Sequence, residues 1–81
     1  MSEMKVQIRL HNVEEAEEFV QAASKCDFDI NISYNRIIID AKSLLGVMSM
    51  DLNRPLTVQY YGENPEFEQI LYHYAVKQVS A

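Results

Sequence analysis

Several kinds of residue are scarce in this chain, and each scarcity excludes a class of protein. Its 81 residues include two glycines, two prolines and no tryptophan, whereas 48% of them are hydrophobic, which is typical of a globular domain rather than a disordered one. The single cysteine, Cys26, has no partner for an internal disulfide and no companion residues at zinc-binding spacing. We therefore expect neither a disulfide framework nor a metal site.

Positive charge is scarce as well. Seven lysines and arginines stand against twelve aspartates and glutamates, which gives a formal net charge of −5. Because binding to nucleic acid requires a cationic surface for the phosphates, no nucleic-acid partner is expected. No apolar run approaches the roughly 20 residues that cross a bilayer, and no apolar segment follows the first residues as it would in a signal peptide. We expect one cytoplasmic domain over residues 1–81, without a membrane contact or a cofactor.

The spacing of hydrophobic residues divides the chain into alternating strands and helices. A period of two is typical of a strand with one buried face, and recurrence every three or four residues is typical of a helix. The pattern predicts strands at 4–10, 28–34, 37–39 and 56–61, long helices at 13–25 and 65–76, and a short helix after Ser43. This βαββαβα order favours an α+β fold in which an antiparallel or mixed sheet has its helices on one face.

Polar residues mark where two of these helices begin. Asn12 is a good N-cap for the helix at 13–25, and Glu15, three residues later, completes a pattern like a capping box. Ser43 takes the same capping position before the short helix. The glutamates after Asn12 are most simply a solvated helix face.

One block of the chain resembles the HPr family, the phosphocarrier proteins of the bacterial sugar phosphotransferase system: residues 21–50, QAASKCDFDINISYNRIIIDAKSLLGVMSM. Near-identical strings stand in that family at QAASK, DINISY and KSLLGVMS, with no gap between them. The predicted order of elements also matches the family over the whole chain. The resemblance implies an HPr-like open-faced β-sandwich, in which a four-stranded antiparallel sheet carries its helices on one face.

The residues that carry the family's function lie just upstream, and there the match fails. Active members have a Gly-x-His-Ala-Arg-Pro motif, whose histidine accepts phosphate from enzyme I and passes it to sugar-specific components. Counting back from Gln21 without gaps puts the acceptor histidine at Asn12, the arginine at Glu14 and the proline at Glu15. His11 lies one position early. The resemblance therefore implies a family member that lacks the phosphoacceptor and has no catalytic residue, and we do not expect an enzyme.

Electrostatics leads to the same expectation. A phosphohistidine at a helix start is stabilised by free backbone N–H groups, by the helix dipole and by a nearby cation. Glu14 and Glu15 place negative charge there and would repel a phosphoryl group. A shift of one residue along a strand also turns the side chain of His11 to the opposite face. We interpret His11 as a surface histidine; the alternative is a divergent phosphocarrier that uses it.

Ser43 matches a second site of the family. In HPr proteins of many Gram-positive bacteria, HPr kinase phosphorylates the serine of this KS pair, and the product acts in carbon catabolite repression, for which a transcriptional regulator is the expected partner. The related protein Crh keeps this serine and lacks the acceptor histidine, and the chain resembles Crh in that respect. A phosphoserine at a helix start is electrostatically favourable. The simpler interpretation, a helix cap alone, stays open.

An apolar group follows Ser43 on the short helix. Its members match residues that dock partners in HPr proteins: Leu44, Leu45, Val47 and Met48. Because a helix this short cannot bury every side, the group predicts a protein-binding surface, with burial in the core as the alternative. Our hypothesis is a non-catalytic, Crh-like regulatory module switched at Ser43. A third possibility is an interaction domain that keeps only the fold and serves another system.

Overall fold

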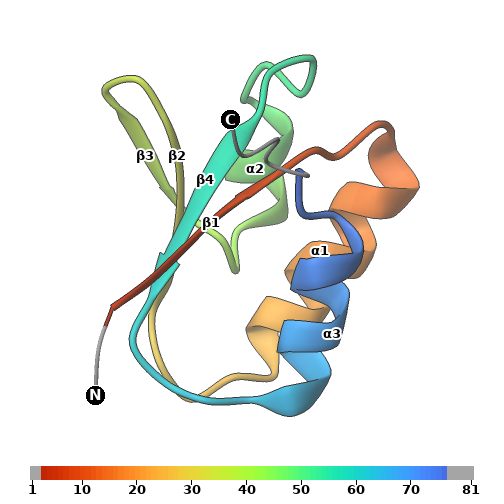
Figure 1. Ribbon diagram of the computed structural model, residues 1–81. Helices are drawn as coiled ribbons and strands as arrows, with labels where there is room; N and C mark the ends of the chain where they lie inside the picture. The colour runs from red at the N-terminus through yellow and green to blue at the C-terminus, as the bar shows by residue number, and fades with distance from the viewer. Residues whose placement is uncertain (1–2, 77–81) are drawn as a thin grey trace, which may run out of the picture.

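The computed structural model describes residues 3–76, which form four strands and three helices. In chain order (Figure 1) these are β1 (Met4–Ile8), α1 (Val13–Ser24), β2 (Ile30–Tyr34), β3 (Ile37–Asp40), α2 (Leu44–Met48), β4 (Leu56–Tyr60) and α3 (Pro65–His73). Every element that the hydrophobic spacing predicts is present, in the predicted order. None of the helices within residues 3–76 is long and apolar enough to cross a membrane.

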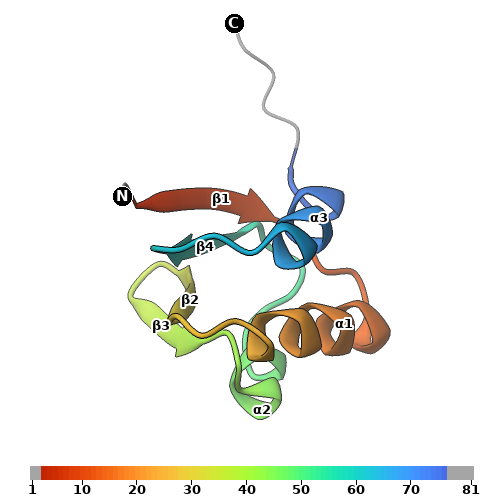
Figure 2. The ribbon, with the colours of Figure 1, turned by 90° about the horizontal axis from the view of Figure 1, so that it is seen from below.

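The four strands form one sheet in the order β1-β4-β2-β3, and all neighbouring pairs are antiparallel. The three helices lie together on one side of this sheet in both views (Figures 1 and 2). These observations confirm the predicted α+β fold, an open-faced sandwich with its helices on one face. Buried residues alternate with half-exposed ones along β4, as one covered face requires: Leu56, Val58 and Tyr60 point inward.

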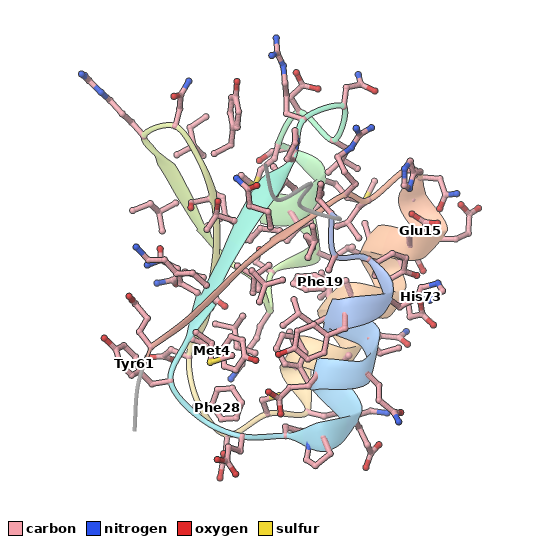
Figure 3. All side chains as sticks on the ribbon, in the orientation of Figure 1. Met4, Glu15, Phe19, Phe28, Tyr61 and His73 are labelled. Atoms are coloured by element: carbon pink, nitrogen blue, oxygen red, sulfur yellow. The ribbon has the colours of Figure 1, made fainter. Side chains whose placement is uncertain are left out.

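Aromatic rings join the helices to the sheet. Phe19 of α1, Phe67 of α3 and Tyr60 of β4 are almost completely buried, and Phe19 projects from its helix toward the sheet (Figure 3). The ring centroid of Phe67 lies 5.4 Å from that of Tyr60, edge to face, and 5.9 Å from that of Phe19. Such pairs contribute about 0.5–1.5 kcal/mol beyond the burial of their area. This cluster holds α1 and α3 against the same face of the sheet.

The last helix is shorter than its hydrophobic stripe predicts. α3 ends at His73 and not at Val76, because the chain leaves the helix there and runs beside β1. The N–H of Arg9 donates to the carbonyl of Tyr74 at 2.9 Å, and the N–H of Val76 donates to the carbonyl of Gln7 at 2.8 Å. Backbone hydrogen bonds to the end of β1 thus replace the last helical turn. The other predicted boundaries agree with the structure to within two residues.

The predicted hairpin between β2 and β3 is present and closes on two residues, Asn35 and Arg36. Asn35 has a φ of 57°, in the left-handed region, which asparagine tolerates better than most residues. The hairpin turn therefore forms although neither residue is glycine. It leaves β3 at the edge of the sheet.

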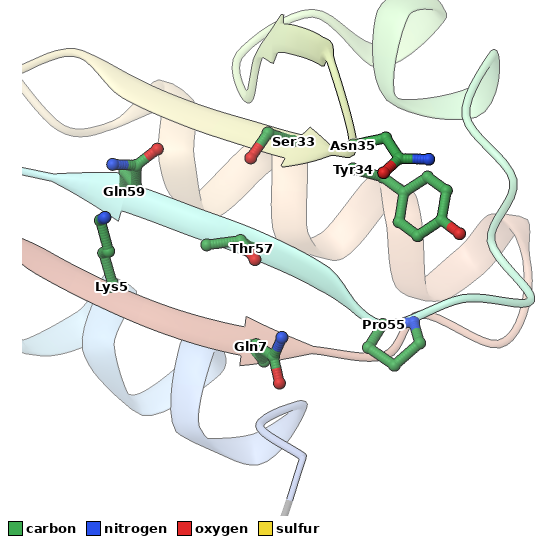
Figure 4. Close-up of a pocket in the computed structure, with 8 residues that line it drawn as sticks. All are labelled: Lys5, Gln7, Ser33, Tyr34, Asn35, Pro55, Thr57 and Gln59. Carbon is green, nitrogen blue, oxygen red and sulfur yellow. The ribbon is translucent and has the colours of Figure 1, made fainter.

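The sheet face away from the helices is polar. Side chains from β1, β2 and β4 line a shallow groove of about 430 Å³ on it, with the ring of Tyr34 near Pro55 at one end (Figure 4). Most of the lining consists of amide, hydroxyl and amino groups, from Lys5, Gln7, Ser33, Asn35, Thr57 and Gln59. The contrast between this face and the apolar one produces the period of two in the sequence.

Candidate functional site

The first candidate site is the junction between β1 and α1. Asn12 has an extended backbone, and its Oδ1 accepts a hydrogen bond from the N–H of Glu15 at 2.9 Å. The predicted N-cap is therefore confirmed. Through this bond Asn12 satisfies one of the N–H groups that a helix leaves unpaired at its start.

Glu15 closes the same junction with its carboxylate. Its Oε1 accepts a hydrogen bond from the N–H of His11 at 2.7 Å and lies 3.0 Å from Nδ1 of the His11 ring. In a capping box this carboxylate takes the N–H of the N-cap residue, here Asn12, but in this chain it reaches one residue further back. His11 and Glu15 are thus joined twice, through the backbone and through the imidazole.

These contacts hold the pKa of Glu15 below its ordinary value. The hydrogen bond from the backbone N–H of His11 is the main cause; partial burial opposes it, and the His11 ring and the charge of His73 lower the pKa further. Figure 3 shows Glu15 and His73 on the same side of the molecule. A carboxylate with a lowered pKa therefore stands at the start of α1 at neutral pH.

A shallow depression of about 330 Å³ connects the junction with the end of α3. Arg9, His11 and Glu15 line it on one side, and His73 and residues 74–76 line it on the other. The Nε atom of Arg9 is buried and has no hydrogen-bond partner among residues 3–76. His73 was not predicted as part of this site, because its position depends on the packing of α3 beside α1. No short spacing in the sequence links it to His11.

The second candidate site begins at Ser43, which is exposed before the first residue of α2. Its Oγ accepts a hydrogen bond from the N–H of Gly46 at 3.1 Å, so the predicted cap is confirmed. Gly46 allows close packing, since a Cβ there would lie only 2.6 Å from Cγ2 of Ile39. α2 is thus held directly against β3, with Ser43 at the surface.

The apolar group after Ser43 is only partly exposed. Leu45 and Met48 are 86% and 40% exposed, and Leu44 is half-buried. The prediction was wrong for Val47, which is completely buried in the core and has no surface to offer a partner. Val47 is the residue of α2 that faces the other core side chains, and a five-residue helix needs one such anchor to stay attached.

Other chemistry is limited in the part of the chain that the structure describes. Within residues 3–76, no group of histidine, cysteine, aspartate and glutamate side chains is arranged to hold a metal ion. Cys26 is buried, and burial raises the pKa of its thiol, so it is a poor nucleophile. The two positions with functional potential are therefore the start of α1 and the surface beside Ser43.

Together, the fold and these positions define a class: a small open-faced α+β domain with a capped helix after its first strand and an exposed serine before a short second helix. The chain belongs to the HPr family, because the family model described as PTS HPr component phosphorylation site matches residues 3–74. Proteins of this family are phosphocarriers rather than catalytic enzymes, and they act with other proteins of the phosphotransferase system.

Solved structures are similar to this one over most of its length. The phosphocarrier protein HPr from Bacillus anthracis str. Ames shares 27% identity with a TM-score of 0.68, covering 90% of this chain and 95% of that one. HPr-C-His from Thermoanaerobacter tengcongensis shares 29% identity with a TM-score of 0.65, covering 90% and 89%. The histidine-containing phosphocarrier protein of a Mycoplasma, at 23% identity and a TM-score of 0.61 over 88% and 84%, supports the fold alone.

Proposed function

We propose that this HPr-family chain does not carry phosphoryl groups and acts instead as a regulatory, protein-binding module. One observation carries the proposal: the start of α1 is closed by the chain's own side chains. The side chain of Asn12 accepts a hydrogen bond from the N–H of Glu15. The carboxylate of Glu15 accepts one from the N–H of His11 and also contacts Nδ1 of the His11 ring. In the gap-free alignment, Asn12 stands where active members have the phosphohistidine.

The charges at this junction oppose phosphorylation. At an effective dielectric constant of about 20, two like unit charges 4 Å apart repel each other by about 4 kcal/mol. The attraction of a helix dipole for an anion is roughly 0.3–1 kcal/mol, so it does not offset a carboxylate at that distance. A phosphoryl group beside Glu15 would therefore be destabilised, whereas the site of a carrier must stabilise it.

A carrier that uses His11 is the alternative function, and one observation favours it. Arg9 and His73 border the same depression as His11 and can supply positive charge there. Against it, a phosphoryl group on Nδ1 would break the contact of that atom with Glu15 and leave the carboxylate beside the phosphate. We propose that His11 is a surface residue whose role is to pair with Glu15.

For the regulatory switch we propose phosphorylation of Ser43 by HPr kinase, as in Crh. The side chain is exposed, and its hydroxyl already accepts the N–H of Gly46, a donor that a phosphate oxygen can also use. Phosphorylation would add about −1.5 to −2 charges at this point. Incubation with HPr kinase and ATP should raise the intact mass by one phosphate, and a Ser43→Ala variant should show no gain.

The proposed partner surface consists of Leu44, Leu45 and Met48 beside Ser43, and a transcriptional regulator is the partner that the family resemblance suggests. Exposed leucine and methionine side chains provide adaptable apolar contacts. A charge at Ser43 would change the electrostatics at the polar edge of this surface. Leu45→Ser with Met48→Ser should abolish binding of the phosphorylated chain to the regulator while the circular dichroism spectrum stays unchanged. Binding that survives this change but fails after His11→Ala would place the surface at the start of α1.

A further inference from the structure

The edge of the sheet at β3 is open. β3 pairs with β2 on one side, and no residue within 3–76 pairs with its other side. Figure 1 shows β3 at the margin of the molecule, and Figure 2 shows α2 close to it. At the opposite edge of the sheet, residues 74–76 cover the end of β1 by hydrogen bonds. The backbone groups of β3 that point away from β2 thus have no strand partner, except that the carbonyl of Asp40 accepts the N–H of Ser43 at 2.9 Å.

This open edge is also apolar. β3 has the sequence Ile37-Ile38-Ile39-Asp40, and the side chains of Ile37 and Ile38 are 53% and 64% exposed. Edge strands are commonly protected from pairing by lysine, proline or a bulge, and β3 has none of these. Successive β-branched residues favour the addition of another strand.

The charges that flank the isoleucines identify the strand that fits. Arg36 precedes Ile37, and Asp40 follows Ile39. The three isoleucines therefore have a positive charge at one end and a negative charge at the other. If two copies pair antiparallel about a two-fold axis at Ile38, each Ile37 lies opposite an Ile39 and each Arg36 lies opposite an Asp40. Opposite charges facing each other across strands are stabilising, and here both ends of the segment gain such a pair.

The backbone supports this register. The N–H of Ala41 donates to the carbonyl of Ile30 at 2.9 Å, and in an antiparallel pair the inward-facing backbone groups recur at every second residue. The groups of Ile39 and Ile37 therefore face β2, whereas those of Ile38 and Asp40 face outward. Outward-facing groups at the two-fold axis are what a hydrogen-bonded pair between the two Ile38 residues requires.

We propose that the edge formed by residues 36–40 is a self-association site, through which two copies of this chain join their sheets into one continuous antiparallel sheet. The partner is a second copy because the segment is complementary in charge and in backbone register to itself. The proposed role does not use the start of α1; Ser43 adjoins this edge, because its N–H donates to the carbonyl of Asp40 at 2.9 Å.

Sedimentation velocity of the full chain over a range of concentrations, at low salt, tests the proposal. We expect a reversible dimer, and at least about a tenfold weaker association for Ile38→Lys, which places two like charges opposite each other at the axis. Arg36→Asp alone and Asp40→Arg alone should each weaken the dimer, and the two changes together should restore it. Gln7→Lys, which adds the same charge on β1, is the matched control and should have no effect.

A covalent test uses the same register. Residues in a hydrogen-bonded antiparallel pair have Cα atoms about 5.5 Å apart, within the range that a disulfide spans. Ile38→Cys should therefore form a linked dimer on mild oxidation, and Gln7→Cys should not, while Cys26 stays buried. The proposal would be overturned if the chain is monomeric at every concentration or if Ile38→Lys leaves the dimer unaffected. It would also be overturned if Arg36→Asp and Asp40→Arg together fail to restore the dimer. A monomeric chain that binds an unrelated extended peptide at this edge would overturn it as well.

Discussion

Replacing Glu15 with glutamine probes the closure of α1 without changing the size of the side chain. The variant keeps an oxygen that can accept the N–H of His11, but it loses the negative charge. Charge-assisted hydrogen bonds are about twice as strong as neutral ones, and a carboxylate in the first turn gains roughly 0.3–1 kcal/mol from the helix dipole. We expect the free energy of unfolding to fall by about 1 kcal/mol at neutral pH, which lowers Tm by about 4–8 °C in a domain of this size.

The effect should depend on pH in one direction. The pKa of Glu15 in the folded chain lies below the ordinary value of 4.5 that applies to the unfolded chain. The stabilisation from its charge is therefore fully present above that unfolded value and is lost as the pH falls through the lower pKa of the folded state. The difference between the original chain and Glu15→Gln should be present at neutral pH and should disappear in acid.

Urea denaturation followed by circular dichroism measures this difference at each pH. Glu14→Gln is the matched control, because Glu14 is exposed in the same helical turn and has no hydrogen bond to His11 in the structure. Glu14→Gln should lower the free energy of unfolding by no more than the helix-dipole contribution of roughly 0.3–1 kcal/mol. Equal losses for the two variants, or a loss at Glu15 that persists in acid, would refute the role assigned to its contacts with His11.

Substitutions at three further residues have expected outcomes. Ser43→Ala should cost about 1 kcal/mol of stability through the lost cap, whereas Ser43→Asp should keep the cap, as thermal denaturation can show. Tyr74 donates a hydrogen bond to Glu18, and burial together with this bond raises the pKa of Tyr74 to about 12. The neutral phenol therefore contributes stability that is lost as the pH rises from about 10 through the folded pKa, and Tyr74→Phe should reduce this alkaline loss in denaturation curves. Gly46→Ala should destabilise the chain by about 1–3 kcal/mol, because the added methyl group would meet Ile39.

Local patterns in the sequence were sufficient to predict the elements of the fold. Alternation along β4 and the stripe of Phe19 and Val20 on α1 arise because each element has one face in the core, and this leaves a period in the sequence. The end of α3 could not be predicted in this way. Tyr74 continues the helical stripe, but the chain gains backbone hydrogen bonds to β1 by leaving the helix, and that depends on where β1 lies.

The same distinction applies to the candidate sites. The caps at Asn12 and Ser43 were predictable, because capping depends on residues three positions apart. The burial of Val47 was not, since five helical residues are too few to define by their spacing which side faces the core. The approach of His73 to Glu15 was also not predictable, because it arises from the packing of two helices that are distant in sequence.

The central claim, that this chain does not carry phosphoryl groups, is tested most directly by intact-mass analysis after incubation with enzyme I and phosphoenolpyruvate. An active HPr protein serves as the positive control, and a variant with Asn12→His, Glu14→Arg and Glu15→Pro shows whether the family's motif can be restored in this fold. We expect the unchanged chain to gain no mass while the control gains one phosphate. An acid-labile gain of one phosphate by the unchanged chain, absent in His11→Ala, would contradict the claim and identify a carrier that uses His11.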